Sequence, residues 1–462
     1  VMTKHVHSSV LKSLAAAAVL TLSGCATAQQ PGMTTPGPSA STAPAEAPWM
    51  GPLGPASMTR GGAGGQIVRV TSLASGGPGS LRAALDVQGP KIIVFEVGGV
   101  IDLNGENLRL ATSNVTIAGQ TAPSPGITLI RGGMVITGHD IIVQHLRVRP
   151  GDLGEAYRSG RDIDAITTIS AHNVIVDHCS LSWATDENLS ASGPRFTGDT
   201  PDAWRAGTSQ SIAYTNNIIA EGLSHSTHAK GEHSKGSLIH DNVSDILIYG
   251  NLYAHNFERS PLFKGGVRGA IVNNFIYNPG QRAIHYNLQG LEWGDVPAQA
   301  GHMDLVGNVM RAGPSTSDGL PLLMIGGDGS LDLHARDNLA IDKWGSPLPA
   351  LGQYTTAASA TVDTTGPSDI ITGLPILDAS EVEPYVLKNA GARPWDRDAV
   401  DVRILADTAE GRGEIIDSQD QVGGYPAVEP THRVFDPSQW DLETMQPVSE
   451  EALDSGLKAK GT

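Results

Sequence analysis

The chain has 462 residues, of which 5% are aromatic and 17% are charged, and it contains 55 glycines. This composition is typical of a β-rich protein with many turns and argues against a helical bundle, which would be rich in Leu, Ala, Glu and Lys. The formal net charge of -17 argues against a nucleic-acid partner, because a phosphate-binding surface needs clustered Lys and Arg. An anionic substrate remains compatible with this charge, since a local basic cleft or a bound cation can attract it.

The first residues have the pattern of an export signal. Basic residues precede a short apolar stretch at residues 14–22, which leads into Ser23, Gly24 and Cys25. The apolar stretch is too short to span a membrane. Residues 20–25 resemble a bacterial lipobox, in which the cysteine is acylated after cleavage. We therefore expect a lipoprotein signal peptide at residues 1–24, lipidation at Cys25, and a chain anchored at the outer membrane or cell surface of a bacterium.

The next segment, residues 25–58, is dense in Pro, Ala, Thr and Ser. Such a composition buries too little apolar surface to fold, so we expect a disordered tether. Only two cysteines occur, Cys25 and Cys179, and a chain anchored through Cys25 has no intramolecular disulfide available. Cys179 lies in an apolar, alternating stretch and is expected to be an inert core thiol.

Short apolar strands then recur along the chain, each with a polar residue near its end. These polar residues are spaced by 23 to 39 positions, and they are His145, His178, Asn217, Asn251, Asn274, Asn308 and Asn338. A repeat of this size without intervening helices predicts a solenoid. Stacked asparagines can bond to one another at each ~4.8 Å step, so we interpret them as ladder residues and not as ligands.

The predicted fold is all-β, a right-handed single-stranded parallel β-helix over residues 59–360. A short helix at residues 79–85 is expected to cap the first coil, because an uncapped solenoid leaves an open sheet edge. Residues 361–462 lose the repeat. We expect them to form a C-terminal extension packed on the β-helix, with an independent second domain as the alternative.

Three groups of charged residues stand apart from the repeat. Asp162 and Asp164 are two positions apart, and on a strand this spacing places both carboxylates on one face. Adjacent acids are costly unless a cation bridges them, and oxygen-only ligation suits calcium; otherwise they are solvated acids. Asp186 follows one repeat later. The third group is a pair of cations, Arg259 and Lys264, just past an asparagine-bearing strand.

At these positions the sequence resembles the pectate lyase family, polysaccharide lyase family one. The resemblance runs over residues 61–286 and, more weakly, over residues 390–424. Its marks are residues 176–180, the pair Asp162 and Asp164, and residues 259–266, which look like the family's Arg-x-Pro-x-x-Arg-Gly element. Lys264 stands where the family commonly has arginine, which predicts a weaker or monodentate substrate contact.

The resemblance implies calcium-dependent anti β-elimination on (1→4)-α-D-galacturonan, the backbone of pectin, which yields 4,5-unsaturated oligogalacturonates. It assigns the calcium ligands to Asp162, Asp164 and Asp186, with Glu187 as an alternative to Asp186. It further implies that the partner is an acidic polysaccharide such as polygalacturonate, and we expect the protein to be a monomer.

The resemblance assigns proton abstraction to Arg259, whose pKa nearby cations, including calcium and Lys264, are expected to lower. Lys264 is expected to bind substrate. The family's supporting lysine matches Lys230, with His225 as the competing alignment, and His228 lies beside them as a further substrate-binding candidate. The two histidines could instead hold a transition metal, but their loop supplies no clear third ligand.

Several other functions stay open at this point. A pectin lyase, or another uronate lyase on the same fold, would not need the acid pair at Asp162 and Asp164. A glycoside hydrolase would need paired acids as general acid and base, and would leave Arg259 without a role. A non-catalytic surface glycan-binding β-helix would bind the polysaccharide without turning it over.

Overall fold

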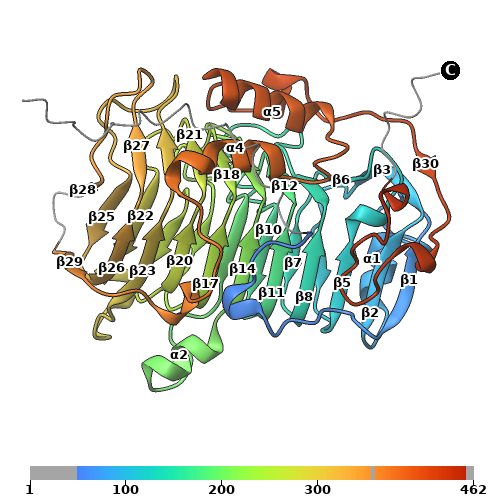
Figure 1. Ribbon diagram of the computed structural model, residues 1–462, viewed down its shortest axis with the longest axis horizontal. Coiled ribbons are helices and arrows are strands. Elements are labelled where there is room, and N and C mark those ends of the chain that lie inside the picture. The colour runs from blue at the N-terminus through green and yellow to red at the C-terminus, as the bar shows by residue number, and fades with distance from the viewer. Residues whose placement is uncertain (1–48, 355–358, 454–462) are drawn as a thin grey trace, which may run out of the picture. The chain divides into compact units, whose positions relative to one another are not determined.

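Repeated short strands stack coil upon coil into three parallel sheets (Figure 1). The computed structural model describes residues 49–354 and 359–453, all of which belong to one compact unit. The predicted signal peptide, Cys25 and residues 25–48 of the predicted tether lie outside the described residues. Each coil contributes one strand to each sheet, so the all-β parallel β-helix predicted from the repeat is confirmed.

Sheet 1 contains eleven strands in the described residues, all parallel, in the following order. They are β1 (Gln66–Val70), β2 (Lys91–Phe95), β5 (Val115–Ala118), β8 (His139–Gln144), β11 (His172–Asp177), β14 (Gln210–Thr215), β17 (Ser244–Tyr249), β20 (Arg268–Val272), β23 (Gly301–Val306), β26 (Ser330–Arg336) and β29 (Thr361–Thr364).

Sheet 2 follows sheet 1 in each coil and contains nine parallel strands in the described residues, joined by one antiparallel strand. They are β3 (Val97–Asp102), β6 (Ile127–Ile130), β9 (Leu146–Arg149), β12 (Ser180–Ser182), β15 (Ile218–Ala220), β18 (Leu252–Ala254), β21 (Phe275–Tyr277), β24 (Val309–Arg311), β27 (Leu339–Ile341) and the antiparallel β30 (Thr431–His432).

Sheet 3 completes each coil and contains nine parallel strands in the described part of the chain. They are β4 (Leu108–Leu110), β7 (Met134–Ile136), β10 (Ile166–Ile169), β13 (Leu189–Ser192), β16 (Leu238–Ile239), β19 (Leu262–Lys264), β22 (Ile284–Leu288), β25 (Leu323–Gly327) and β28 (Leu351–Gln353). One buried apolar cluster fills the space enclosed by the three sheets, because alternate residues of every strand point inward.

The asparagine ladder forms where sheet 1 turns into sheet 2. Each side-chain amide donates to the amide oxygen of the asparagine in the next coil, at 2.9 to 3.1 Å. The ladder consists of Asn217, Asn251, Asn274, Asn308 and Asn338. All of these amides therefore serve the backbone turn, as the sequence interpretation expected.

The first two marks of the repeat, His145 and His178, are not part of this ladder. They lie one position earlier, in the left-handed region at φ 54° and 50°, where they stack on each other. Cys179 occupies the ladder position instead, and its backbone N–H donates to Asn217 at 2.8 Å. Cys179 is fully buried, and burial raises the pKa of its thiol to about 12, so it is an inert core residue.

The N-terminal end of the described chain packs on the solenoid, although the sequence interpretation extended the tether to residue 58. Trp49 stacks on Trp395, and the N–H of Gly51 donates to Asp177 at 3.1 Å. A 3-10 helix, η1 (Gly54–Ala56), follows. The predicted cap forms as α1 (Leu81–Asp86), with Ser80 as its N-cap and its apolar face in the core of the first coils.

The C-terminal extension runs back along the solenoid, over sheet 2 (Figure 1). It begins after β29, slightly later than the predicted boundary at residue 360. Its helices, together with those of the solenoid loops, are α2 (Pro201–Gly207), α3 (Gly290–Trp293), α4 (Ala379–Asn389), α5 (Ala399–Glu410), η2 (Gly119–Thr121), η3 (Asp369–Ile371), η4 (Gln419–Val422), η5 (Pro437–Gln439) and η6 (Glu450–Ala452). None of the helices in the described ranges has the length and apolarity needed to cross a membrane.

Buried ion pairs fix the extension to sheet 2. Arg149 donates to Asp398 at 2.5 and 3.0 Å and to Asp401 at 2.9 Å, and Arg147 lies 3.6 and 3.5 Å from the same two carboxylates. Both arginines and Asp401 are fully buried. Asp398 also caps α5 by accepting the N–H of Asp401 at 3.0 Å. Two buried cations are therefore matched by two acids that only the extension supplies.

Candidate active site

Charged side chains line up in the turns that join sheet 2 to sheet 3. In successive coils these turns bring Asp164 before β10, Glu187 before β13, Lys235 before β16 and Glu258 before β19. Bridges between coils set the register, because Glu187 pairs with Lys235, and Lys235 with Glu258. Residues that lie far apart in sequence thus form one row across neighbouring coils, which we call the charged row.

Three carboxylates gather at one end of the charged row. One oxygen from each of Asp164, Asp186 and Glu187 lies within 4.8 Å of the others. The backbone holds them there, since the N–H of Glu187 donates to Asp164 at 2.9 Å and that of Asp186 to the carbonyl of Ile163 at 3.2 Å. Loss of hydration, together with the charges of Glu187 and Asp186, raises the pKa of Asp164 well above its usual value.

Arg259 reaches this acid cluster from two coils further along. Its guanidinium forms an ion pair with Glu187, and its Nε lies 3.8 Å from Glu258. Burial by itself would lower the pKa of Arg259, but Glu187, Glu258 and Asp186 raise it above its ordinary value. In the cation-free protein acids thus surround the guanidinium, and the expectation that calcium and other cations lower its pKa stays a prediction for the calcium-loaded protein.

Lys235 was missed in the sequence interpretation, and it occupies the centre of the charged row. Only 4% of the residue is exposed, and its ammonium lies 2.9 Å from both Glu232 and Glu258. Glu258 also binds Arg282. These cations and Arg259 lower the pKa of Glu258, although burial opposes them. Lys235 is thus a better structural match for a supporting lysine than Lys230, whose side chain is exposed.

Two histidines hold the carboxylate of Asp186. His233 Nε2 lies 2.6 Å and His228 Nε2 lies 3.8 Å from the same oxygen, and the two rings stack at 3.6 Å. Burial lowers the pKa of His233 to about 3, so the ring is neutral and its Nε2–H donates to Asp186. His228 Nδ1 accepts the N–H of Lys230 at 3.1 Å, which places its proton on Nε2 as well.

This arrangement bears on the transition-metal alternative. Asp186, His228 and His233 have ligand atoms close enough to hold an ion. Asp186 thus supplies the third ligand that the loop sequence lacked, and the histidine pair and the acid cluster share this carboxylate. In the cation-free protein we interpret the histidines as residues that orient Asp186.

The predicted acid pair does not come together. Asp162 and Asp164 are in the turn before β10 and not on a strand, so their side chains are not held on one face. Asp162 is exposed and, unlike Asp164, is absent from the acid cluster. His225 is also exposed, and its N–H donates to Asp417 of the extension at 2.9 Å. Of the predicted set, the structure brings together Asp164, Asp186, Arg259 and His228.

Lys264 lies at the end of β19 beneath a surface loop. It is 7% exposed, forms an ion pair with Glu292 of α3, and lies 3.5 Å from Asp241. Arg195 binds the same two carboxylates, at 2.7 Å and 3.0 Å. A substrate carboxylate would have to compete with Glu292 for Lys264, which the sequence comparison could not reveal.

The acid cluster has the chemistry of a calcium site. Its donors are all carboxylate oxygens, and burial, together with the negative charge of neighbouring acids, raises the pKa of both Asp164 and Glu187. A divalent cation relieves such repulsion, and oxygen ligands are those that calcium prefers. The residues present therefore fit calcium, with Asp164, Asp186 and Glu187 as its ligands.

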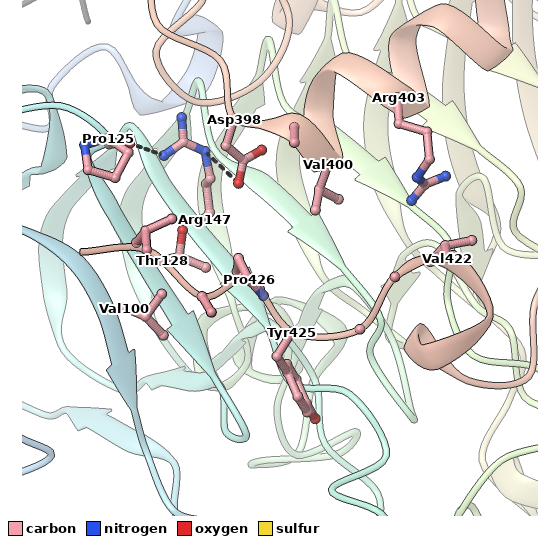
Figure 2. Close-up of a pocket in the computed structure, with 15 residues that line it drawn as sticks. Val100, Pro125, Thr128, Arg147, Asp398, Val400, Arg403, Val422, Tyr425 and Pro426 are labelled. Atoms are coloured by element: carbon pink, nitrogen blue, oxygen red, sulfur yellow. Dashed lines mark hydrogen bonds and ion pairs between the residues drawn. The ribbon is translucent and has the colours of Figure 1, made fainter. Parts of the chain in front are cut away.

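A separate cavity of about 580 Å³ lies between sheet 2 and the extension (Figure 2). It is lined by apolar side chains such as Val100, Val400 and Val422, and none of the charged row lines it. Its cations are already engaged: Arg147 donates to the carbonyl of Pro125 at 2.6 Å, and Arg403 pairs with Glu221. The chemistry of the candidate site thus lies outside this cavity.

Comparison with known proteins identifies relatives of this chain. No protein-family model matches the chain. A protein of Aspergillus flavus named probable pectate lyase C is 31% identical over 369 residues, which cover 79% of this chain and 78% of that protein. Its counterpart from Aspergillus terreus is 36% identical over 258 residues, or 56% of this chain and 52% of that protein. The chain thus spans about half the length of the Aspergillus terreus protein.

The fold has a counterpart among solved structures. The crystal structure of jun a 1, the major allergen from cedar pollen, matches with a TM-score of 0.52 and 19% identity, over 74% of this chain and 92% of that one. The right-handed parallel β-helix and the sequence relatives together define the class, that of the parallel β-helix polysaccharide lyases. Within it, the chain belongs to the pectate lyase family.

Proposed function

We propose that the protein is a calcium-dependent pectate lyase that cleaves (1→4)-α-D-galacturonan by β-elimination. The observation that carries this proposal is the position of Arg259 beside three carboxylates, Asp164, Asp186 and Glu187. The acids can hold a cation that binds a uronate, and the arginine is the group next to them that can take a proton. The relatives named pectate lyase support the same activity.

In the proposed reaction Arg259, in its neutral form, removes the proton from C5 of a galacturonate. The electron pair of the C–H bond forms the C4–C5 double bond, and the oxygen linked to C4 leaves with its sugar and takes up a proton from water. Arg259 returns its proton to the solvent afterwards. The products are a 4,5-unsaturated non-reducing end and a new reducing end. Proton transfer to a positioned group contributes ~10²–10⁴-fold to such a step.

Calcium held by the acid cluster would neutralise the substrate carboxylate and make the neighbouring C5 proton more acidic. The residues of this chain set the other conditions. His228 and His233 keep Asp186 oriented, and two of the acids that raise the pKa of Arg259, Glu187 and Asp186, belong to the cluster that a cation would neutralise. Arg259 is therefore expected to lose its proton more readily in the calcium-loaded enzyme.

The acid cluster separates this proposal from its alternatives. A pectin lyase acting without metal has no use for Asp164, Asp186 and Glu187 in one place. A glycoside hydrolase needs two carboxyl groups on either side of the scissile bond, whereas here the acids share one small space and Glu187 is paired with Arg259. A glycan-binding protein without activity would not need an arginine at the acids.

Removal of calcium is expected to abolish activity. Polygalacturonate should yield unsaturated product, measured as ultraviolet absorbance, and a chelator should reduce the rate to background because the acid cluster then repels the uronate. Excess calcium should restore the rate, and Asp186→Asn should raise the calcium concentration required. New reducing ends without absorbance would identify a hydrolase, and chelator-insensitive action on esterified pectin would identify a pectin lyase. Binding without turnover would identify a glycan-binding protein.

Replacement of Lys235 tests the corrected assignment of the supporting lysine. Lys235→Met keeps much of the side-chain volume but leaves Glu232 and Glu258 without their shared cation. Because Glu258 also contacts Arg259, we expect kcat on polygalacturonate to fall about 10²-fold through misplacement of the guanidinium. Lys230→Met is the matched variant, and a larger loss there than at Lys235 would restore the sequence-based assignment.

We also propose that the protein is exported and anchored through a lipid on Cys25. This rests on the sequence of residues 1–25, in which a short apolar stretch leads into Ser23-Gly24-Cys25. An anchored lyase would act on polysaccharide outside the cell, where its polymeric substrate is found.

A further inference from the structure

The turns that carry the charged row continue beyond the candidate active site. Past β19, the sheet 3 strands β22, β25 and β28 follow in order, and each is preceded by a turn from sheet 2. Hydrogen bonds connect these turns: Ser317 N–H donates to Gly280 at 3.0 Å, and Leu322 N–H donates to Pro349 at 2.9 Å. The turn before β28 therefore lies three coils from Arg259, or about 14 Å at the strand spacing of a sheet.

A cleft of about 300 Å³ opens between the last two of these turns. Thr316, Ser317 and Asp318 line it from one turn, and Asp342, Lys343 and Trp344 line it from the other. Trp344 is 77% exposed, whereas the other six of the seven tryptophans, all in the described residues, are buried or half-buried. The cleft therefore lies beside the one exposed indole of the described chain.

The indole is presented by a rigid turn. Asp342 accepts the N–H of Trp344 at 2.9 Å and that of Ser346 at 2.8 Å, while its own N–H donates to the carbonyl of Ser346 at 2.8 Å. The ammonium of Lys343 lies 4.5 Å from the centre of the indole ring. The cation thus lies over one face of the ring, and Trp344 stays 77% exposed at the surface.

We propose that this cleft is a remote subsite for the same polyuronate chain, which rests on the proposed function. The indole face complements the apolar C–H face of a pyranose ring, and Lys343 can pair with the carboxylate of a uronic acid. Thr316 and Ser317 supply hydroxyl groups for the sugar. Its place in the row of turns means that a long chain bound at Arg259 can extend to Trp344, whereas a short oligomer cannot.

The experiment compares binding of polygalacturonate and of trigalacturonate by calorimetry, with calcium present and with Arg259→Ala to prevent turnover. We expect Trp344→Ala to weaken polygalacturonate binding about tenfold and to leave trigalacturonate binding unchanged. Trp344→Phe should restore most of the affinity, because it keeps an aromatic face. Val434→Ala removes a similarly exposed apolar side chain from the extension and should have no effect.

Two results would overturn the subsite. One is equal loss of affinity for both ligands, which indicates general damage, and the other is unchanged affinity for the polymer. Loss of a dimer in Trp344→Ala, seen by light scattering, would also overturn it, since the indole would then be a contact between copies. Failure of the proposed function can be distinguished from failure of the subsite. If the polysaccharide stays intact and no unsaturated product forms, but polymer binding still depends on Trp344, the lyase is refuted and the subsite is retained.

Discussion

Replacement of Arg259 with alanine is expected to lower turnover on polygalacturonate at least ~10³-fold, with the fold retained. The guanidinium is the group that faces the acid cluster, and neither Lys235 nor Arg282 can take over its contact with Glu187 while they are paired with Glu258. The rate is measured as ultraviolet absorbance of the unsaturated product under saturating calcium, and circular dichroism checks the fold.

The matched control is Arg268→Ala, which removes an exposed arginine at the start of β20 in sheet 1. This variant should retain the activity of the parent, because sheet 1 does not contribute to the charged row. If Arg259→Ala kept most of its activity with calcium bound, Arg259 would not be the base. The next group to consider would then be Lys235, which shares Glu258 with it.

Replacement of Asp401 with alanine is expected to destabilise the protein by about 3–5 kcal/mol. Asp401 is fully buried, accepts from Arg149 at 2.9 Å, and accepts the hydroxyl of Ser180 at 2.6 Å. Its loss leaves Asp398 as the single acid facing Arg147 and Arg149. Such buried cations cannot recover their hydration while α5 stays docked.

Urea unfolding followed by fluorescence measures this loss, and limited proteolysis reports whether α5 detaches first. Glu410→Ala is the control on the same helix, since Glu410 is exposed and pairs only with the exposed Arg412 at 2.8 Å. It should change stability by less than ~1 kcal/mol. Equal effects of the two substitutions would show that the buried network does not hold the extension.

The fold could be predicted because its repeat is local. Each coil carries its own apolar alternation and its own asparagine, so the ladder from Asn217 to Asn338 is visible without knowing the loop lengths. His145 and His178 were wrongly assigned to the ladder. The sequence does not distinguish a polar residue in the left-handed position from a polar residue in the neighbouring ladder position. The ladder position in that coil could not be recognised from the sequence, because it is occupied by the thiol of Cys179 and not by an amide.

Asp164, Asp186 and Arg259 were assigned through the family resemblance, which did not extend to Lys235. Lys235 precedes β16, a strand of two residues that leaves almost no pattern. Its position is set by pairing with Glu187 and Glu258 in other coils, and that register depends on loops of unequal length. Lys230 was chosen instead because it lies in a conspicuous segment, although that segment exposes it.

The extension that returns over sheet 2 changes how the solenoid can come apart. In a bare stack each coil touches only its neighbours, so the ends can fray one coil at a time. Here one continuous segment bonds to Asp304 in β23 through Ser368, to Arg149 in β9 through Asp398, and to β3 through β30. Opening any coil along this path breaks its contacts with the C-terminal extension, and the same extension is bound to other coils. The middle and the N-terminal coils should therefore melt together, as a single cooperative unit.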